Sequence, residues 1–186
     1  MKKIIYVLIL NLILVLNVSA KNHNLAQVTE LDKLFNELSK INNIFDGDIL
    51  EKKIWAVWNK HPNQKFLTEK LELGTKLMYQ RQYDYALEVF TNIIEIDPEW
   101  PEAWNKRATL LFLMKDYQKS LDDINKVLDL EPRHFGALSG RAQIYIDLEL
   151  YQKALEDLKD AKKIHPVIRG NGLIDELEKL INGENV

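Results

Sequence analysis

Three segments of the chain carry the same pattern. They read YDYALEVFTNIIEIDPEW (residues 83–100), YQKSLDDINKVLDLEPRH (residues 117–134) and YQKALEDLKDAKKIHPVI (residues 151–168). Each segment starts with a tyrosine, and Pro98, Pro132 and Pro166 follow one another at intervals of 34 residues. A constant period of this length is typical of repeat proteins. The chain therefore divides into units of residues 67–100, 101–134 and 135–168.

Each unit is predicted to form two helices. In the second unit, apolar side chains recur at helical spacing over residues 103–112 and again over residues 121–128, with a break near Asp116. A proline then ends the unit, because proline cannot continue a helix and moves the preceding residue out of the helical region. The pattern predicts an all-α chain.

The small and aromatic residues of the unit resemble those of tetratricopeptide repeats, a family with a period of this length. In the third unit, Ala142, Ala154 and Ala161 stand at the small positions of that pattern, Tyr145 at an aromatic position and Pro166 at the end. The first two units match it with a few substitutions. The resemblance covers residues 67–168 and implies a right-handed α-solenoid of helix-turn-helix repeats.

The two flanking regions are also predicted to be helical. Residues 21–66 read as a leader and a helical hairpin that resembles a degenerate repeat. We expect Trp55 and Trp58 of this hairpin to pack against the first helix of unit 67–100, rather than to form an exposed aromatic patch. Residues 169–186 read as an amphipathic capping helix and a tail, which would cover the apolar end of the array.

Residues 1–20 have the features of a cleaved secretory signal. Lys2 and Lys3 precede the apolar run 4–16, and residues 18–20 are suited to cleavage before Lys21. The chain contains no cysteine, which excludes disulfides and a lipoprotein attachment site. We therefore expect a periplasmic or secreted bacterial protein with no membrane contact after cleavage. An uncleaved membrane anchor is the alternative.

Composition argues against catalysis and against nucleic-acid binding. The formal charge is −3, and loss of the two lysines in residues 1–20 makes it −5, so a nucleic acid is a disfavoured partner. His61, His134 and His165 stand at unit boundaries, where we expect them at the surface, and they lack metal-ligand spacing. Glycine-rich phosphate loops and nucleophile motifs are missing. We expect no enzyme activity, no cofactor and no metal.

Positions 7 and 23 of the unit change together along the chain. They hold Leu73 with Val89, then Arg107 with Asp123, then Arg141 with Asp157. Positions that vary together are expected to touch. We interpret the arginines as partners of internal ion pairs. The alternative is that they clamp a ligand carboxylate or phosphate.

The resemblance implies that the first helix of each unit lines a concave groove. The side chains expected there combine amides and hydroxyls with apolar groups: Thr75, Tyr79, Asn105, Thr109, Phe112, Ser139, Gln143 and Ile146. Such a surface suits an extended peptide. We interpret the protein as a non-catalytic adaptor of the bacterial cell envelope that binds a peptide or protein segment. The alternatives are a self-associating structural solenoid and a non-catalytic subunit of an envelope enzyme complex.

One specialised groove is missing from the sequence. Members of the family that bind chaperones hold a C-terminal carboxylate with lysines, an arginine and asparagines at five fixed positions. In this chain those positions hold Leu71, Thr75, Lys106, Gly136 and Gly140. The carboxylate clamp is therefore absent.

Overall fold

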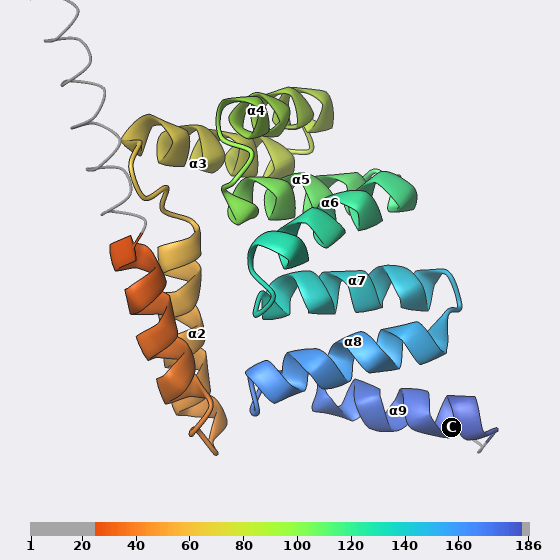
Figure 1. Ribbon diagram of the computed structural model, residues 1–186. Coiled ribbons are helices and arrows are strands. Elements are labelled where there is room, and N and C mark those ends of the chain that lie inside the picture. The colour runs from red at the N-terminus through yellow and green to blue at the C-terminus, as the bar shows by residue number, and fades with distance from the viewer. Residues whose placement is uncertain (1–24, 184–186) are drawn as a thin grey trace, which may run out of the picture.

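The computed structural model describes residues 25–183, and all regular structure in that range is helical. Residues 1–24, with the predicted signal peptide, and residues 184–186 lie outside it. The helices are residues 25–38, α2 (Ile44–Trp58), α3 (Lys65–Tyr79), α4 (Tyr83–Ile96), α5 (Pro101–Leu113), α6 (Tyr117–Leu130), α7 (Phe135–Asp147), α8 (Tyr151–Ile164) and α9 (Asn171–Asn182). Helices α3 to α9 stack in sequence order, as Figure 1 shows. The predicted all-α solenoid is confirmed.

The two helices of each unit are joined by the same tight turn. Arg81, Lys115 and Glu149, which are 34 residues apart, have φ angles of 59°, 64° and 59°. One residue later, a backbone N–H bonds the carbonyl oxygen five residues back, as from Gln82 to Leu77 at 2.9 Å. This hydrogen-bond pattern ends a helix and reverses the chain. The turn lets the second helix of the unit fold back on the first.

Small side chains allow the helices of a unit to approach closely. Ala86, Ala142 and Ala154 are fully buried. Ser120 is also buried, and its hydroxyl donates to the carbonyl oxygen of Ala108 at 2.7 Å on the facing helix. A methylene on Gly74 would lie 2.6 Å from the Phe90 ring. The small positions of the repeat are therefore set by helix packing.

The arginines at position 7 form internal ion pairs. Arg107 contacts both carboxylate oxygens of Asp123 at 2.8 Å, and Arg141 contacts those of Asp157 at 2.8 and 2.7 Å. The remaining nitrogen of each guanidinium reaches the preceding unit. Arg107 donates to Thr91 at 3.3 Å and Arg141 to Asn125 at 2.8 Å. Both arginines are therefore partners of ion pairs and hydrogen bonds inside the fold.

We expect Arg141→Ala to lower the free energy of unfolding by about 1–3 kcal/mol, because it leaves the buried Asp157 carboxylate unpaired. Arg141→Leu combined with Asp157→Val copies the first unit and should recover part of that loss. Denaturant unfolding of the single and double variants measures both effects. A double variant whose loss equals the sum of the two single losses would contradict the pairing.

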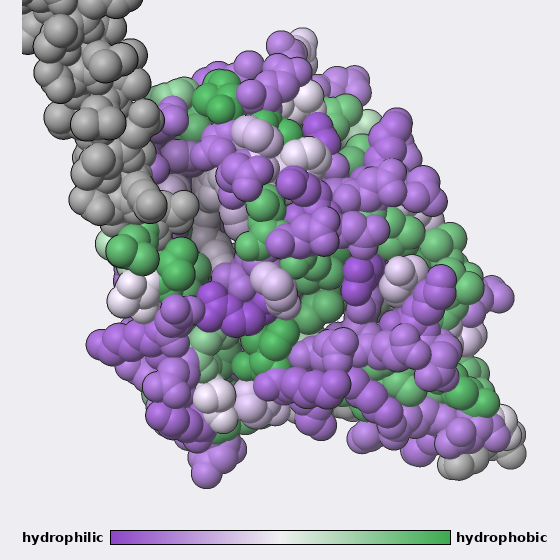
Figure 2. Space-filling model, viewed as in Figure 1, coloured by the Kyte–Doolittle hydropathy of each residue, from purple (hydrophilic) through white to green (hydrophobic). Residues whose placement is uncertain are grey.

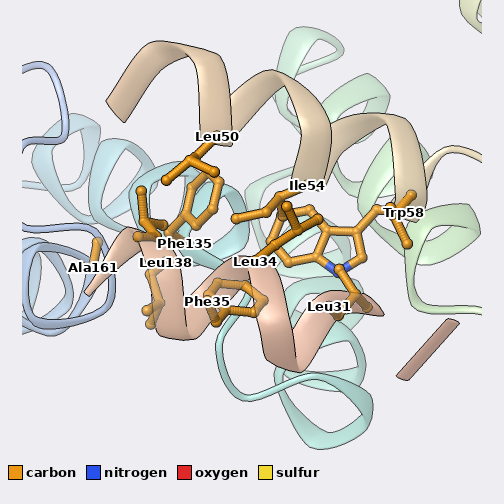
Figure 3. Packing of buried hydrophobic residues seen from close by; sticks show 11 residues of the cluster. Leu31, Leu34, Phe35, Leu50, Ile54, Trp58, Phe135, Leu138 and Ala161 are labelled. Carbon is orange, nitrogen blue, oxygen red and sulfur yellow. The ribbon is translucent and has the colours of Figure 1, made fainter. Parts of the chain in front are cut away.

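The N-terminal hairpin does not stack on the first unit. We call residues 25–58 the crossing hairpin, because α2 runs across the ends of the stacked helices at the left of Figure 1. Its apolar residues pack against α7 and α8 (Figure 3), in a cluster of Leu31, Leu34, Phe35, Leu38, Leu50, Ile54, Val57 and Trp58 with Phe135, Leu138 and Ala161. The degenerate repeat is thus not a stacked unit of the array.

The predicted packing of Trp55 and Trp58 on the first helix of unit 67–100 is wrong. Trp58 stacks on His134 with ring centroids 4.0 Å apart, and Trp55 lies edge-on to Phe135 at 5.8 Å. Only the backbone of Trp58 faces the first unit, where its carbonyl oxygen accepts from Trp100 at 3.1 Å. Both tryptophans therefore pack on the rings of His134 and Phe135 at the start of α7.

The expected surface position of His61, His134 and His165 is also wrong, because all three are at least 97% buried, with exposures of 3%, 0% and 1%. Each imidazole binds one carboxylate. The distances are 2.8 Å from His61 to Asp97, 3.1 Å from His134 to Glu102 and 3.2 Å from His165 to Glu51. Hydrogen bonds to both ring nitrogens balance the burial of His61 and His134, whereas Nδ1 of His165 is buried without a hydrogen-bond partner.

Two carboxylates that are hydrogen-bonded to histidines make the stability of the fold depend on pH. The hydrogen bond with His165 lowers the pKa of Glu51, although partial burial opposes it, and His61 lowers the pKa of Asp97 in the same way. A carboxylate with a lowered pKa stabilises the fold above its ordinary pKa. That contribution is lost as the pH falls through the lowered value.

The melting temperature should therefore fall as the pH is lowered from about 5 to about 3. We expect a smaller fall for Glu51→Gln, because this variant keeps the side-chain shape but no longer titrates. Glu30→Gln, at an exposed carboxylate of the first helix, is the matched control and should follow the wild type. Equal slopes for Glu51→Gln and the wild type would show that the His165 contact does not contribute.

Candidate functional site

Two of the hollows beside the first helices of the units contain residues predicted for the groove. The α3 hollow, of about 480 Å³, lies against α3 and is lined by residues that include Leu71, Thr75 and Tyr79. The α5–α7 cleft, of about 220 Å³, lies between α5, α6 and α7. Its lining residues are Asn105, Ala108, Thr109, Phe112, Ser120, Ile124, Gly136, Ala137, Gly140, Gln143 and Ile144.

The α5–α7 cleft exists because α7 has glycine where a side chain would fill the space. A methylene on Gly140 would meet nothing within 4 Å, so the volume beside it is open. At Gly136 a methylene would lie 2.6 Å from the Trp55 ring, which closes that end of the cleft. Two glycines four residues apart in a helix cost stability, about 1 kcal/mol each relative to alanine. The two glycines of α7 are the sequence signal for the cleft, although neither carries a functional group.

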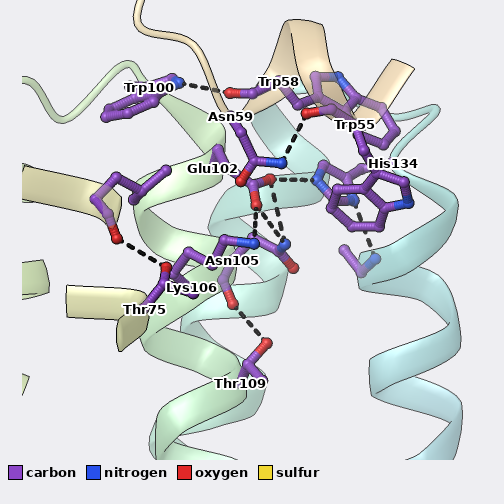
Figure 4. A network of polar contacts seen from close by, with 12 residues as sticks. Trp55, Trp58, Asn59, Thr75, Trp100, Glu102, Asn105, Lys106, Thr109 and His134 are labelled. Atoms are coloured by element: carbon purple, nitrogen blue, oxygen red, sulfur yellow. Dashed lines mark hydrogen bonds and ion pairs between the residues drawn. The ribbon is translucent and has the colours of Figure 1, made fainter. Parts of the chain in front are cut away.

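A buried carboxylate lies beside the cleft (Figure 4). Glu102 is fully buried and accepts from Lys106 at 2.9 Å, from Asn105 at 3.2 Å and from His134 at 3.1 Å. Burial alone would raise the pKa of Glu102, but the hydrogen bond from His134 and the charge of Lys106 outweigh it and hold the pKa below its ordinary value. Glu102 is therefore an anion that orients the groups around it.

The tautomer of His134 follows from its contacts. Its Nδ1 accepts from the backbone N–H of Ala137 at 3.0 Å, at the first turn of α7. The proton of the neutral ring must then be on Nε2, which donates to Glu102. His134 thus joins the N-terminus of α7 to the buried carboxylate of α5.

The far end of the cleft has a second polar cluster. Asp147 accepts from the Tyr117 hydroxyl at 2.6 Å and from the Gln143 amide at 3.0 Å. These two hydrogen bonds hold the pKa of Asp147 below its ordinary value. The ring of Tyr117 lies 5.8 Å from that of Phe112, so the aromatic wall of the cleft is joined to this cluster.

The predicted groove residues fall into three groups. Asn105, Thr109, Phe112 and Gln143 line the α5–α7 cleft. Thr75 and Tyr79 line the α3 hollow, where Tyr79 is 79% exposed. Ser139 and Ile146 line neither: the Ser139 hydroxyl donates to the Phe135 carbonyl at 2.9 Å, and Ile146 packs against the cluster beneath α9.

The polar side chains of the cleft already donate hydrogen bonds within the protein, although the Gln143 amide keeps one of its two protons. The side-chain amide of Asn105 donates to Glu102, and that of Gln143 donates to Asp147. The Thr109 hydroxyl donates to the backbone carbonyl of Asn105 at 2.9 Å. Each side chain is left with oxygen lone pairs for a ligand. The cleft therefore combines apolar walls with hydrogen-bond acceptors, and its lining contains no lysine or arginine.

Residues 25–183 contain neither a metal-binding cluster nor a membrane-spanning helix. No group of three or more histidine, cysteine, aspartate or glutamate side chains is placed to hold a metal ion. Over the same residues, no helix has the length and apolar content needed to cross a membrane.

Comparison with known proteins supports the repeat assignment. Residues 79–161 match the family model described as anaphase-promoting complex, cyclosome, subunit 3. A TPR repeat-containing protein of Rhizobium etli is 32% identical over 97 residues. That match covers 52% of this chain and 47% of the relative, so the chain spans about half the length of the curated protein that it matches.

Solved structures show the same fold. The first TPR domain of Spaghetti (RPAP3), bound to an HSP90 peptide, has a TM-score of 0.59 at 21% identity and covers 62% of this chain and 93% of that one. The TPR2B domain of yeast Sti1, in complex with an Hsp70 peptide, has a TM-score of 0.53 at 22% identity and covers 63% and 94%. With its 34-residue period and these structural matches, the described chain has the tetratricopeptide-repeat fold.

Proposed function

We propose that the protein is a non-catalytic adaptor that binds a peptide segment of another protein in the α5–α7 cleft. The size of the cleft supports this. Its volume of about 220 Å³ is below the roughly 300–1,000 Å³ of usual small-molecule sites, and it suits one apolar side chain. Peptide recognition by the RPAP3 and Sti1 domains supports the class of ligand.

The acceptor character of the cleft defines the ligand further, and it is the observation that carries the proposal. An extended peptide presents backbone N–H groups, and the oxygens of Asn105, Thr109 and Gln143 can accept from them. A C-terminal carboxylate would meet acceptors and no lysine or arginine in the cleft lining, because the lysine and arginine positions of the chaperone-binding clamp hold Leu71, Gly136 and Gly140 here. We therefore propose an internal segment with one apolar anchor residue, rather than a chain end.

A displayed library of random peptides should yield binders that share one apolar residue. Their affinity should be the same with a free or an amidated C-terminus. Gly140→Leu should weaken binding at least about tenfold, or 1.4 kcal/mol, because the new side chain occupies the cleft, where its Cβ meets nothing within 4 Å. Leucine also has the higher helix propensity, so the melting temperature should not fall.

Gly172→Leu is the matched control, since Gly172 lies in α9 away from the cleft and a methylene there also meets nothing within 4 Å. Phe112→Ala should weaken the same peptides by a similar factor, because it removes an aromatic wall. Titration by fluorescence anisotropy measures each affinity. Equal binding by Gly140→Leu and Gly172→Leu would remove the cleft from consideration.

The proposed setting is the bacterial cell envelope, with export directed by residues 1–20. The support is the arrangement of Lys2, Lys3 and the apolar run 4–16, together with a bacterial relative. Cleavage would leave a chain that begins at Lys21. Self-association and membership of an envelope enzyme complex are the competing roles.

Intact-mass measurement on the envelope fraction of producing cells tests the export step. We expect a mass that starts at Lys21, because small residues precede that position. A mass that retains residues 1–20 would indicate a membrane-anchored protein. Recovery of the protein only from the cytosol would contradict export altogether.

A further inference from the structure

The turns inside the second and third units form an apolar edge of the array. We call residues 113–116 the second turn, residues 147–150 the third turn, and both together the turn edge. In Figure 1 these turns, which join α5 to α6 and α7 to α8, lie at the right, and the crossing hairpin lies at the left. The apolar side chains of the turn edge are Leu113, Met114, Leu148 and Leu150, which are 43%, 36%, 41% and 41% exposed. At the right of Figure 2, hydrophobic surface lies over the ends of α5 and α7.

The turn itself does not require these apolar side chains. All three units have the same turn, with one residue of positive φ and the same closing hydrogen bond. On either side of the residue with positive φ, the first unit has Gln80 and Gln82, whereas the third unit has Leu148 and Leu150. Because glutamine is accepted at both positions, the local fold does not explain the leucines. Exposed apolar groups that gather in one place mark an interaction surface more often than scattered ones.

The second and third turns lie next to each other. Tyr117, the first residue after the second turn, donates to Asp147 of the third turn at 2.6 Å. The Lys115 ammonium lies 3.5 Å from the same carboxylate. The apolar groups of the two turns therefore belong to one surface.

The two turns carry opposite charges at the same position. Lys115 and Glu149 are the residues with positive φ, and both are exposed. The other two carboxylates of the turn edge have cation partners, since Asp116 binds Lys119 at 2.6 Å and Asp147 lies near Lys115. Within residues 25–183, Glu149 has no ion-pair partner. The turn edge thus has a lysine at one end and an unpaired glutamate at the other.

A surface of this kind is complementary to itself. If a second copy is rotated by 180° about an axis between the two turns, its third turn faces the second turn of the first copy, and the reverse holds as well. Lys115 of each copy then meets Glu149 of the other, and apolar groups meet apolar groups. The Lys115 ammonium has three protons, so it can bind a second carboxylate beside Asp147. A pairing of like turns would put lysine against lysine, which is unfavourable.

We propose that two copies of the protein form a weak, two-fold symmetric dimer through the turn edge. Lys115 of one copy binds Glu149 of the other, and the apolar groups of the second turn pack on those of the third. Because a two-fold axis closes the pair, a dimer forms and not a filament. No residue of the turn edge lines the α5–α7 cleft, so the dimer does not depend on the proposed peptide binding.

Sedimentation of the chain without residues 1–20, which retains all of the described residues, measures the dimer. The contact is small, so we expect a dissociation constant on the order of 100 µM. The protein should then be monomeric at about 1 µM and mostly dimeric at about 1 mM, with a smaller dimer fraction at high salt. A monomer at about 1 mM would assign the turn edge to a different partner and overturn the dimer.

Charge reversal tests which residues meet. Lys115→Glu and Glu149→Lys should each weaken the dimer at least about tenfold, because each variant brings like charges together at both contacts. An equimolar mixture of the two variants should dimerise like the wild type, because every reversed charge then meets an opposite one. Each variant gives a turn the residue that the other turn already has at this position, so both should stay folded by circular dichroism.

Arg81→Glu is the matched control. Arg81 has the same place in the first turn, with a φ angle of 59°, but it lies outside the turn edge, so this variant should dimerise like the wild type. Gly140→Leu should also dimerise, which makes failure of the cleft and failure of the dimer distinguishable. A dimer that neither reversal weakens, or a mixture that associates no better than each variant alone, would contradict the pairing of Lys115 with Glu149.

Discussion

The stack of Trp58 on His134 determines how the parts of this molecule are arranged. The two rings lie 4.0 Å apart with planes within 6°. Because His134 also donates to Glu102 and accepts from the first turn of α7, the stack joins the crossing hairpin to α5 and α7 at once. It draws the hairpin away from α3, which leaves the first unit open. It also holds the Glu102 carboxylate that engages the Asn105 amide beside the cleft.

Much of the array could be predicted, because a repeat lets one chain be compared with itself. The change from Leu73 with Val89 to Arg141 with Asp157 was visible in a single sequence, and the contact followed from it. The position of the hairpin could not be obtained in this way. Its partners His134 and Phe135 lie more than 75 residues from Trp58 and have no counterpart in another unit, so no internal comparison shows the pairing.

The helices that line the cleft could be predicted from the sequence, but the hydrogen bonds of the individual side chains could not. The resemblance to tetratricopeptide repeats placed Thr109, Phe112 and Gln143 in one groove, and all three line the cleft. The sequence pattern does not show which polar side chains are already hydrogen-bonded to their neighbours in the fold. The Asn105 amide donates to Glu102, and the Ser139 hydroxyl donates to the Phe135 backbone carbonyl of its own helix. The opening beside Gly140 exists because glycine has no side chain. Reasoning from functional groups does not detect such a position.

The contacts of the crossing hairpin also affect how the chain folds. Stacked repeats usually touch only their neighbours and can unfold from one end. Here Asp32 binds Arg133 and Asp48 binds Arg169, which closes loops of 101 and 121 residues. Closing such long loops has an entropic cost before the contacts form, so folding is slower than for a linear array of this size. In return, these contacts tie the crossing hairpin to the third unit, so we expect the two to unfold together.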